Sequence, residues 1–419
     1  MAGYPCYSDD KRRITCRFDI YEGPRYFTEE ITFKGNLLFK SEELADAIPL
    51  KKGEFYSPKK LKDSEKQISD LYAGQGHLDV GYMPAARGLA SRVSYDMERH
   101  VVYVEFTIEE GEPTIIRDVR IEGNEKTQEN VIRRELKFNP GERVDLRKIE
   151  ESKRRLMKLD YFDREEPEPV EVVFEPAEGR YRDAVVRVKE GRTGMIRFSV
   201  GFSTNFGPMG EVMYQDRNFD ISDTPKDWDD FWDGTAFRGA GHILTISIRP
   251  GTQRTDAVLQ FLNPSINDTP YRWGFNAYVY ERYYSLYADR RYGASVSFGR
   301  RLTEWLGEDW IVTLTPGIEN IYIHDAEKFV PRDVTDAEGS HIRHYDRLKL
   351  EYDSRDSFTF PTEGNLFETM FEVSTCDVET VKYSIGDKQY WTVWNPKWWG
   401  KHVLSIEGSY TIVGNYGPD

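Results

Sequence analysis

The sequence lacks any apolar run that could cross a bilayer as a helix. Its 419 residues are 39% hydrophobic, and nowhere do about 18 apolar residues follow one another, as a transmembrane helix requires. It also lacks an excess of positive charge: 57 Lys and Arg stand against 72 Asp and Glu, for a formal net charge of −15. We therefore expect no nucleic-acid partner, since phosphate binding needs a basic surface. A membrane remains possible, because a transmembrane strand presents apolar residues to lipid only at every second position.

Cysteines are few, and no leader sequence is recognisable. None of the three Cys lies in a CxxC or other metal-binding spacing. Cys6 and Cys16 flank a turn-like SDDK segment and could lie on neighbouring strands, bridged or not. Cys376 lies in a predicted strand, where we expect it to be buried or to face lipid. The first residues, MAGYPCYSDDKRR, hold no apolar stretch for a signal peptide. Either the chain starts inside a longer protein or a membrane interpretation is wrong.

The first half of the chain contains a repeat of 88 residues. Glu22-Gly23 is matched by Glu110-Gly111, Gly35-Asn36 by Gly123-Asn124, and a third acidic-glycine pair, Glu190-Gly191, closes the second copy. Each copy has a short strand that ends at Gly-Asn, then a short and a long helix, then two strands. The expected elements are 31–34, 41–48, 58–73, 78–83 and 101–109 in the first copy, and 117–122, 127–136, 145–159, 170–174 and 184–189 in the second.

The repeat predicts two α+β domains with the order β-α-α-β-β. We expect them at residues 24–111 and 112–191, preceded by the C-terminal remnant of another copy at 1–23 and followed by a different domain at 192–419. Such domains could serve only as spacers between other parts, or they could handle polypeptides. The repeat alone does not separate these two interpretations.

From about residue 194 the helical periodicity gives way to alternation. Ile196, Phe198, Val200 and Phe202 interleave with Arg197, Ser199, Gly201 and Ser203, for example, and all nine Trp lie in this half. Many of these strands are about 10–12 residues long, which suits a tilted transmembrane strand better than a soluble sheet, although a soluble sandwich can alternate in the same way. The candidates are 194–204, 209–218, 241–250, 252–262, 271–282, 290–301, 309–323, 342–353, 365–376, 386–395 and 401–413.

The number of candidate strands, eleven, is odd. Bacterial single-chain barrels have even strand numbers. Either one assignment is wrong or the barrel is unfinished.

Several motifs resemble one family. Over about 1–191, the EGP segment, the Gly-Asn turn, the two helices and the strand ending in EG look like polypeptide-transport-associated (POTRA) domains. LTISIRPGTQRTDAVLQFLNPSINDTPYRWGFNAYVYER (244–282) resembles the early barrel hairpins of the BamA family of outer-membrane assembly proteins. YDSRDSFTFPTEG (352–364) is similar to that family's YDxRDxxxFPxxG segment, which is the most specific match.

The resemblance implies a fold, a location and an activity. The fold would be α+β POTRA repeats followed by an all-β antiparallel transmembrane barrel, with eleven of roughly sixteen strands present and the closing strands and an inward-folding Val-Arg-Gly-Phe-like loop beyond residue 419. The protein would lie in the outer membrane with its POTRA domains in the periplasm, and would insert other barrels there. Its implied partners are unfolded outer-membrane proteins, accessory assembly lipoproteins and outer-membrane lipids. We expect no enzyme activity, no cofactor and no metal.

Two groups of residues are candidates for function under this resemblance. The first barrel strand would receive a client strand at its edge, along Ile196, Phe198, Val200 and Phe202. The second group belongs to the family motifs, where a purely structural role in turns is the simpler interpretation: Asp353, Arg355, Asp356, Pro361 and Gly364 in the barrel half, and Gly35, Asn36, Gly123 and Asn124 in the repeats.

Other functions remain open at this point. A related translocation or secretion factor, TamA-like or of the two-partner type, would share the architecture, and a passive pore would share the barrel. Nothing supports an enzyme attached to a barrel. His341 and His344 lack further ligands for a metal, PKDWDDFWDG (225–234) lacks the spacing of a calcium loop, and KKLKDSEKQ (59–67) reads as the solvated face of a helix.

Overall fold

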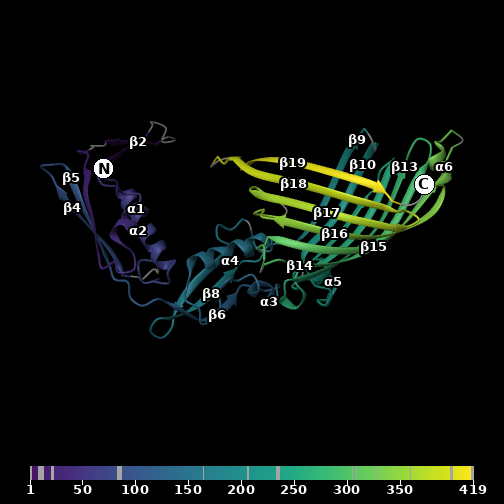
Figure 1. Cartoon of the computed structure of the whole chain (residues 1–419). Coiled ribbons are helices and arrows are strands. Elements are labelled where there is room, and N and C mark those ends of the chain that lie inside the picture. The colour runs from purple at the N-terminus through teal and green to yellow at the C-terminus, as the bar shows by residue number, and fades with distance from the viewer. Residues whose placement is uncertain are drawn as a thin grey trace. The chain divides into compact units, whose positions relative to one another are not determined.

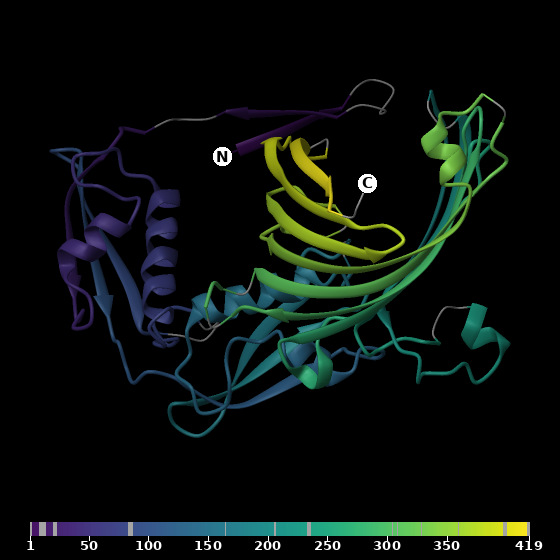
Figure 2. The same ribbon diagram turned by 45° about the vertical axis from the view of Figure 1, so that its right-hand side comes forward.

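The computed structural model divides the chain into two compact units (Figures 1 and 2). One comprises Met1–Asp118, Phe138–Arg147 and Phe174–Asp183, and the other Val119–Lys137, Lys148–Val173 and Ala184–Asp419. Among the described residues, no helix is long and apolar enough to span a bilayer. The structure describes residues 2–7, 14–19, 23–82, 87–163, 165–204, 207–232, 236–303, 305–307, 309–327, 329–358, 360–396 and 400–416.

The first repeat domain packs two helices on a three-stranded sheet. The sheet has the order β3-β5-β4, with β3 parallel and β4 antiparallel to β5. Its core joins Leu44 and Tyr72 of the helices to Val104 and Phe106 of the sheet, all buried. The longer helix begins at Pro58, where a missing N–H leaves no helical bond unmade. The elements are β3 (Phe27–Lys34), α1 (Ser41–Ala47), α2 (Pro58–Ala73), β4 (Leu89–Asp96) and β5 (Val101–Ile108).

The second repeat domain has the same element order, and its sheet has the equivalent order β6-β8-β7. The repeat extends to single backbone contacts, since the bridge between Phe27 and Phe55 recurs between Ile115 and Arg143. The elements are β6 (Ile115–Glu122), α3 (Glu129–Arg133), α4 (Leu146–Lys158), β7 (Val170–Pro176) and β8 (Tyr181–Val188).

The Gly-Asn motifs form the turn after the first strand of each repeat. Gly35 and Gly123 have φ of +81° and +87°, a left-handed conformation that favours glycine. An added Cβ would lie 2.1 Å from Ile108 O in the first copy and 2.0 Å from Val188 O in the second. Both glycines are therefore required by conformation and by space.

Side chains complete these turns in the same way in both copies. The amides of Asn36 and Asn124 donate to the carbonyl three residues later, at 2.9 and 3.0 Å. The carboxylates of Glu110 and Glu190, from the acidic-glycine pairs, accept backbone N–H groups of the turn, including those of Leu37 at 2.6 Å and Thr127 at 2.7 Å. The acidic-glycine pairs therefore belong to the same structural unit as the Gly-Asn turns.

The strand predicted at 78–83 is wrong. Residues 78–82 form turns, residue 83 lies outside the described part, and the strand beside β5 is β4, at Leu89–Asp96. Gly76 and Gly81 have φ of +86° and +80°, which breaks extended backbone. Leu78 and Val80 are fully buried, so their apolar character reflects core packing of a turn.

The opening residues form a pair of strands, as expected. The predictions for the three cysteines have separate outcomes. Strand β1 (Ala2–Tyr7) pairs antiparallel with β2 (Ile14–Asp19), with Pro5 opposite Cys16 and Cys6 opposite Thr15. The side chains of these two cysteines lie outside the described part, so a bridge stays a prediction. Cys376 is exposed, at the last residue of β17 (Gly364–Cys376), so it is not buried, and the alternative that it faces lipid stays a prediction.

Strands β9 to β19 form one antiparallel sheet in sequence order. All eleven predicted strands are present, and Figure 2 shows the sheet curling. Short helices α5 (Trp228–Trp232), η1 (Ile266–Asp268) and α6 (Arg332–Asp336) lie in its connections. The strands are β9 (Gly194–Ser203), β10 (Gly207–Phe219), β11 (His242–Arg249), β12 (Arg254–Asn263), β13 (Tyr271–Tyr283), β14 (Ala288–Arg301), β15 (Trp310–His324), β16 (Gly339–Asp353), β17 (Gly364–Cys376), β18 (Thr380–Trp394) and β19 (His402–Asn415).

The alternation gives this sheet one apolar and one polar face. Large apolar side chains such as Phe298, Leu348 and Phe371 are about half exposed on one face, at 54%, 50% and 46%. On the other face, Arg343 lies between Glu319 and Glu372, and Glu372 is 1% exposed. Apolar outside and polar inside is the pattern of a transmembrane barrel strand.

Candidate functional site at the first barrel strand

Strand β9 forms one end of the eleven-stranded sheet. It pairs with β10 along its whole length, from Gly194 opposite Asp216 to Ser203 opposite Gly207. No other described strand pairs with it. An edge strand presents a row of N–H and C=O groups to which another strand can bond.

The register shows which backbone groups face the open edge. In an antiparallel pair the N–H and C=O of one residue point to the same neighbour, and successive residues alternate between the two sides. Gly210 of β10 donates its N–H to Pro250 O at 2.8 Å, on the β11 side, so its partner Val200 has no ladder bond with β10. Every second residue of β9 therefore directs its backbone groups to the open edge, and these are the four predicted residues Ile196, Phe198, Val200 and Phe202.

The side chains of these four residues lie together on the apolar face. Their exposed fractions are 62%, 75%, 92% and 77% in chain order. Ser199 lies on the opposite face and donates to Glu211 at 2.9 Å. The side chains thus lie on the apolar face, and the open edge itself consists of backbone groups.

Different constraints act on the glycine within β9 and on the glycine in the turn after it. A Cβ at Gly201 would meet nothing within 4 Å, so space does not require glycine there. Gly207 has a φ of +67°, which the turn into β10 requires. Gly201 therefore lowers strand stability without a packing gain.

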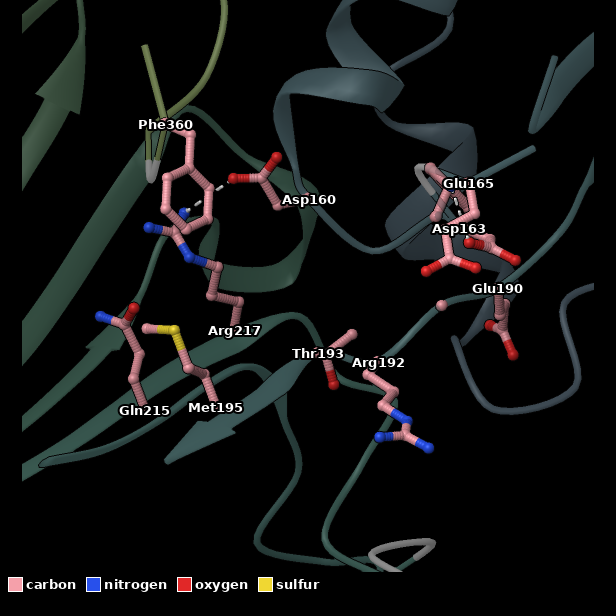
Figure 3. A pocket seen from close by; sticks show the side chains of 12 residues that line it. Asp160, Asp163, Glu165, Glu190, Arg192, Thr193, Met195, Gln215, Arg217 and Phe360 are labelled. Atoms are coloured by element: carbon pink, nitrogen blue, oxygen red, sulfur yellow. Dashed lines mark hydrogen bonds and ion pairs between the residues drawn. The ribbon is translucent and has the colours of Figure 1, made fainter. Parts of the chain in front are cut away.

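The base of β9 borders a cavity of about 750 Å³. Figure 3 shows Asp160 and Arg217 facing each other on one side, with Phe360 beside them, and Asp163, Glu165 and Glu190 on the other side. Arg217 Nη1 lies 3.9 Å from Asp160 Oδ2. The lining comes from the second repeat domain, from β9 and β10, and from the turn after β16: Asp160, Phe162, Asp163, Glu165, Glu190, Gly191, Arg192, Thr193, Met195, Gln215, Arg217 and Phe360.

The YDSRDSFTFPTEG segment is the turn between β16 and β17, and its charged residues pair within it. Arg355 donates to both carboxylate oxygens of Asp353, at 2.9 and 2.8 Å. Asp356 accepts the N–H and hydroxyl of Thr362 at 2.8 and 2.6 Å, and the N–H of Glu363 at 3.2 Å. Burial raises the pKa of Asp356, but these hydrogen bonds outweigh it and leave that pKa below its usual value. The geometry agrees with the structural interpretation of the motif.

The end of the same turn depends on Gly364. Its φ is +104°, and an added Cβ would lie 2.4 Å from Ser354 O. Ser354 in turn donates its N–H to Asn365 O at 2.9 Å. Pro361 lies between these contacts, outside the strands. The conformation of Gly364 and the bond between Ser354 and Asn365 together close the connection between the two strands.

Sequence reasoning missed the contacts that join the second repeat domain to the sheet. Asn218 of β10 donates to the Thr127 hydroxyl at 2.8 Å, and both residues are buried. Lys158 of α4 donates to the carbonyl of Asp353 at 2.8 Å. A basic residue at the end of a helix is ordinarily explained by contacts within that helix. No signal in the sequence could therefore have paired residues 195 positions apart.

The histidines considered as metal ligands have no cluster of further ligands around them in the part of the chain that the structure describes. Among the described residues no three His, Cys, Asp or Glu side chains gather as metal ligands. His341 Nε2 lies 2.9 Å from Ala337 O, and His344 lies 3.9 Å from Asp346.

Comparison with protein-family models gives two matches. The Omp85 superfamily domain matches residues 236–417. The POTRA model, described as the surface antigen variable number repeat, matches residues 26–111 and 114–191. The POTRA model therefore matches the half that contains the repeats, and the Omp85 model matches the half that forms the large sheet.

Known relatives and a solved structure agree with these matches. Outer membrane protein assembly factor BamA of Nitratidesulfovibrio vulgaris is 27% identical over 378 residues, covering 89% of this chain and 43% of the relative. BamA of Neisseria meningitidis serogroup B is 21% identical over 428 residues, covering 98% and 49%. The chain thus spans less than half the length of these curated relatives. The crystal structure of Haemophilus ducreyi BamA lacking POTRA domains 1–3 covers 94% of this chain and 71% of that one at a TM-score of 0.65 and 18% identity, which shows the fold. The chain is a BamA-type member of the Omp85 superfamily, with its barrel in the outer membrane and its POTRA domains in the periplasm.

Proposed function

We propose that this protein assembles β-barrel proteins into the outer membrane by pairing client strands with the open edge of β9. The observation that carries the proposal is the register of β9, which directs the backbone groups of Val200 and its alternate neighbours away from β10. The relatives from Nitratidesulfovibrio and Neisseria are named outer membrane protein assembly factors, which supports the same class of activity.

The physical basis is the cost of unpaired backbone in lipid. A client strand that enters hydrocarbon alone leaves N–H and C=O groups unsatisfied, at several kcal/mol each. An edge that already offers partners in the right spacing removes much of that cost. Alternate residues among the ten of β9 present donors and acceptors at the edge, so affinity comes from the backbone, and the side chains contribute only the register.

The repeat domains offer further edges of the same kind. Strand β4 is an outer strand of the first domain's sheet, and β7 is an outer strand of the second. An extended client could add to these edges in the periplasm before it reaches β9. Capture there would keep the client unfolded and close to the membrane.

The proposed mechanism contains no covalent step, so the protein is not an enzyme and needs no cofactor. The exposed apolar face of β9 would contact outer-membrane lipids during insertion. Accessory assembly lipoproteins would bind the periplasmic domains. A TamA-like translocation factor, a two-partner secretion transporter and a passive pore are the competing functions.

A locked seam tests the proposal. In the whole protein, one Cys would replace Phe198 or Val200, and a second would lie in the strand that closes the barrel against β9. Oxidation should stop insertion of a client barrel into lipid vesicles, and reduction should restore it, while gel migration with and without heating shows the host barrel folded in both states. Normal insertion through the locked seam would contradict the proposal. Ion conductance without any insertion in either state would favour the pore.

A further inference from the structure

The turn between β16 and β17 places one aromatic ring among three cations. The Lys158 ammonium lies 5.2 Å from the centre of the Phe358 ring, the Arg217 guanidinium 5.7 Å and the Arg355 guanidinium 6.0 Å. Lys158 ends helix α4, Arg217 lies in β10, and Arg355 lies in the turn itself. Since an aromatic ring attracts cations, Phe358 links three segments that are distant in sequence.

Lys158 is held in this position by polar contacts as well. Its ammonium donates to Asp353 O at 2.8 Å and lies 3.7 Å from Asp309 Oδ1, and its side chain is 21% exposed. Burial lowers the pKa of Lys158, although Asp353 and Asp309 act to raise it. A cation that has lost much of its water depends on such partners, so its contacts with the turn are specific.

The same cluster continues to the base of β9. Arg217 Nη1 lies 3.9 Å from Asp160 Oδ2, and the Ser357 hydroxyl donates to Asp160 at 3.3 Å. The backbone N–H of Arg217 donates at 3.3 Å to the carbonyl of Thr193, the residue before β9. Figure 3 shows Asp160 facing Arg217, and Thr193 beside Arg192 near the centre of the view. A shift of Arg217 would therefore change the start of the edge strand.

We propose that Phe358 is a positioning residue that fixes the second repeat domain on the β16–β17 turn and thereby fixes the base of β9. The ring holds Lys158 of the repeat domain and Arg217 of the sheet at the same time. Loss of the ring removes the contact that Lys158 and Arg217 share and leaves each cation only its polar partners, and the first residues of β9 then open more often. A consequence for client insertion rests on the proposed function, whereas the positioning itself does not.

Hydrogen exchange of the whole protein in lipid vesicles tests the positioning. Phe358→Leu keeps an apolar side chain of similar bulk but has no ring, and Lys158→Met keeps the length without the charge. Each should speed amide exchange over residues 192–196 by about tenfold, the scale of one or two lost cation–π contacts. Phe358→Tyr keeps the ring and should exchange like the wild type, which distinguishes a cation–π role from simple filling of space.

Two matched controls use residues outside the cluster. Phe329 is 90% exposed, and Lys153 pairs with Glu150 on the surface of α4. Phe329→Leu and Lys153→Met should leave exchange over 192–196 unchanged, and heat-modifiable gel migration should show every variant folded. Unchanged exchange in both Phe358→Leu and Lys158→Met would overturn the proposal, as would equal effects of Phe358→Leu and Phe358→Tyr.

Client insertion by the same variants separates this inference from the proposed function. Faster exchange with slower insertion supports the positioning role and its consequence. Faster exchange with unchanged insertion overturns the consequence for clients and leaves the seam mechanism to the disulfide experiment. If oxidation of the seam does not affect insertion but exchange still rises in Phe358→Leu, the proposed function fails while the positioning role stands.

Discussion

Proline at Val200 should block client pairing while leaving β9 bonded to β10. The N–H of Val200 points to the open edge because its partner Gly210 bonds toward β11. Proline removes that N–H and adds ring atoms on the same side. The bonds between β9 and β10 come from the residues on either side, Ser199 and Gly201, which keep their N–H groups. The change therefore acts on the edge that a client would use.

The size of the effect follows from one unpaired carbonyl on the client. A buried acceptor without a partner costs about 1–3 kcal/mol in protein and more in hydrocarbon, so we take about 2–4 kcal/mol here. At about 1.4 kcal/mol for each factor of ten, client insertion should slow by about 30-fold to 1,000-fold. The assay is the rate at which a radiolabelled client barrel becomes heat-modifiable in vesicles that contain the whole protein.

Two variants are needed beside it. Val200→Ala keeps the N–H and loses only an exposed side chain, so its insertion rate should stay within a factor of about two, as for most surface changes. Ser199→Pro removes a bond to β10 and should instead lower the heat stability of the host barrel. Insertion by a folded Val200→Pro variant at the wild-type rate would refute the assignment of the open edge. So would a stronger defect in Val200→Ala than in Val200→Pro.

Three further predictions concern the domains and the sheet. Residues 24–191 expressed alone should be soluble and unfold cooperatively, and a disordered product would contradict the domain assignment. In this fragment Phe106→Ala, at a fully buried position, should lower the unfolding free energy by about 3–5 kcal/mol in urea titrations. Burial raises the pKa of Glu110, but hydrogen bonds from Leu38, Tyr72 and Leu37 outweigh it and lower that pKa below 4.5. The stabilisation by Glu110 is therefore complete above about pH 4.5 and is lost as the pH falls through the folded-state pKa. In Glu110→Gln the unfolding free energy should depend less steeply on pH in that window. An unchanged slope would show that the Glu110 carboxylate does not contribute to the pH dependence. The 419-residue chain, with β9 and β19 at the open ends of its sheet, should oligomerise in detergent, and light scattering that shows a stable monomer would argue against open edges.

The elements that could be predicted from sequence are those that local chemistry determines. Alternation located the eleven strands, because side chains of period two must divide between an apolar and a polar face. Gly35 and Gly123 marked turns because their positive φ favours glycine. The prediction failed at 78–83, where Leu78 and Val80 alternate with polar residues but lie in a buried turn between two left-handed glycines. Alternation over so few residues does not distinguish strand from turn.

The functional site could be predicted only in part. The sequence located Ile196 to Phe202 as one apolar stripe, yet the direction of their backbone groups depends on the register with β10 and β11, which no local pattern contains. The motif turn was found, and its internal pairing of Asp353 with Arg355 agrees with the structural interpretation. Its contacts with Lys158 and Asp160 join residues nearly 200 positions apart, so only the folded chain reveals them.

The most direct test of the account is a disulfide scan between β9 and a client strand stalled during insertion. Single Cys variants at each position from Ile196 to Phe202 would be combined with Cys variants along the client's terminal strand, and cross-links would be formed in vesicles with the whole protein. The account predicts one antiparallel register in which partner positions move in opposite directions, one residue at a time, along both strands. Cross-links scattered without register, or confined to the repeat domains while clients still insert, would contradict it.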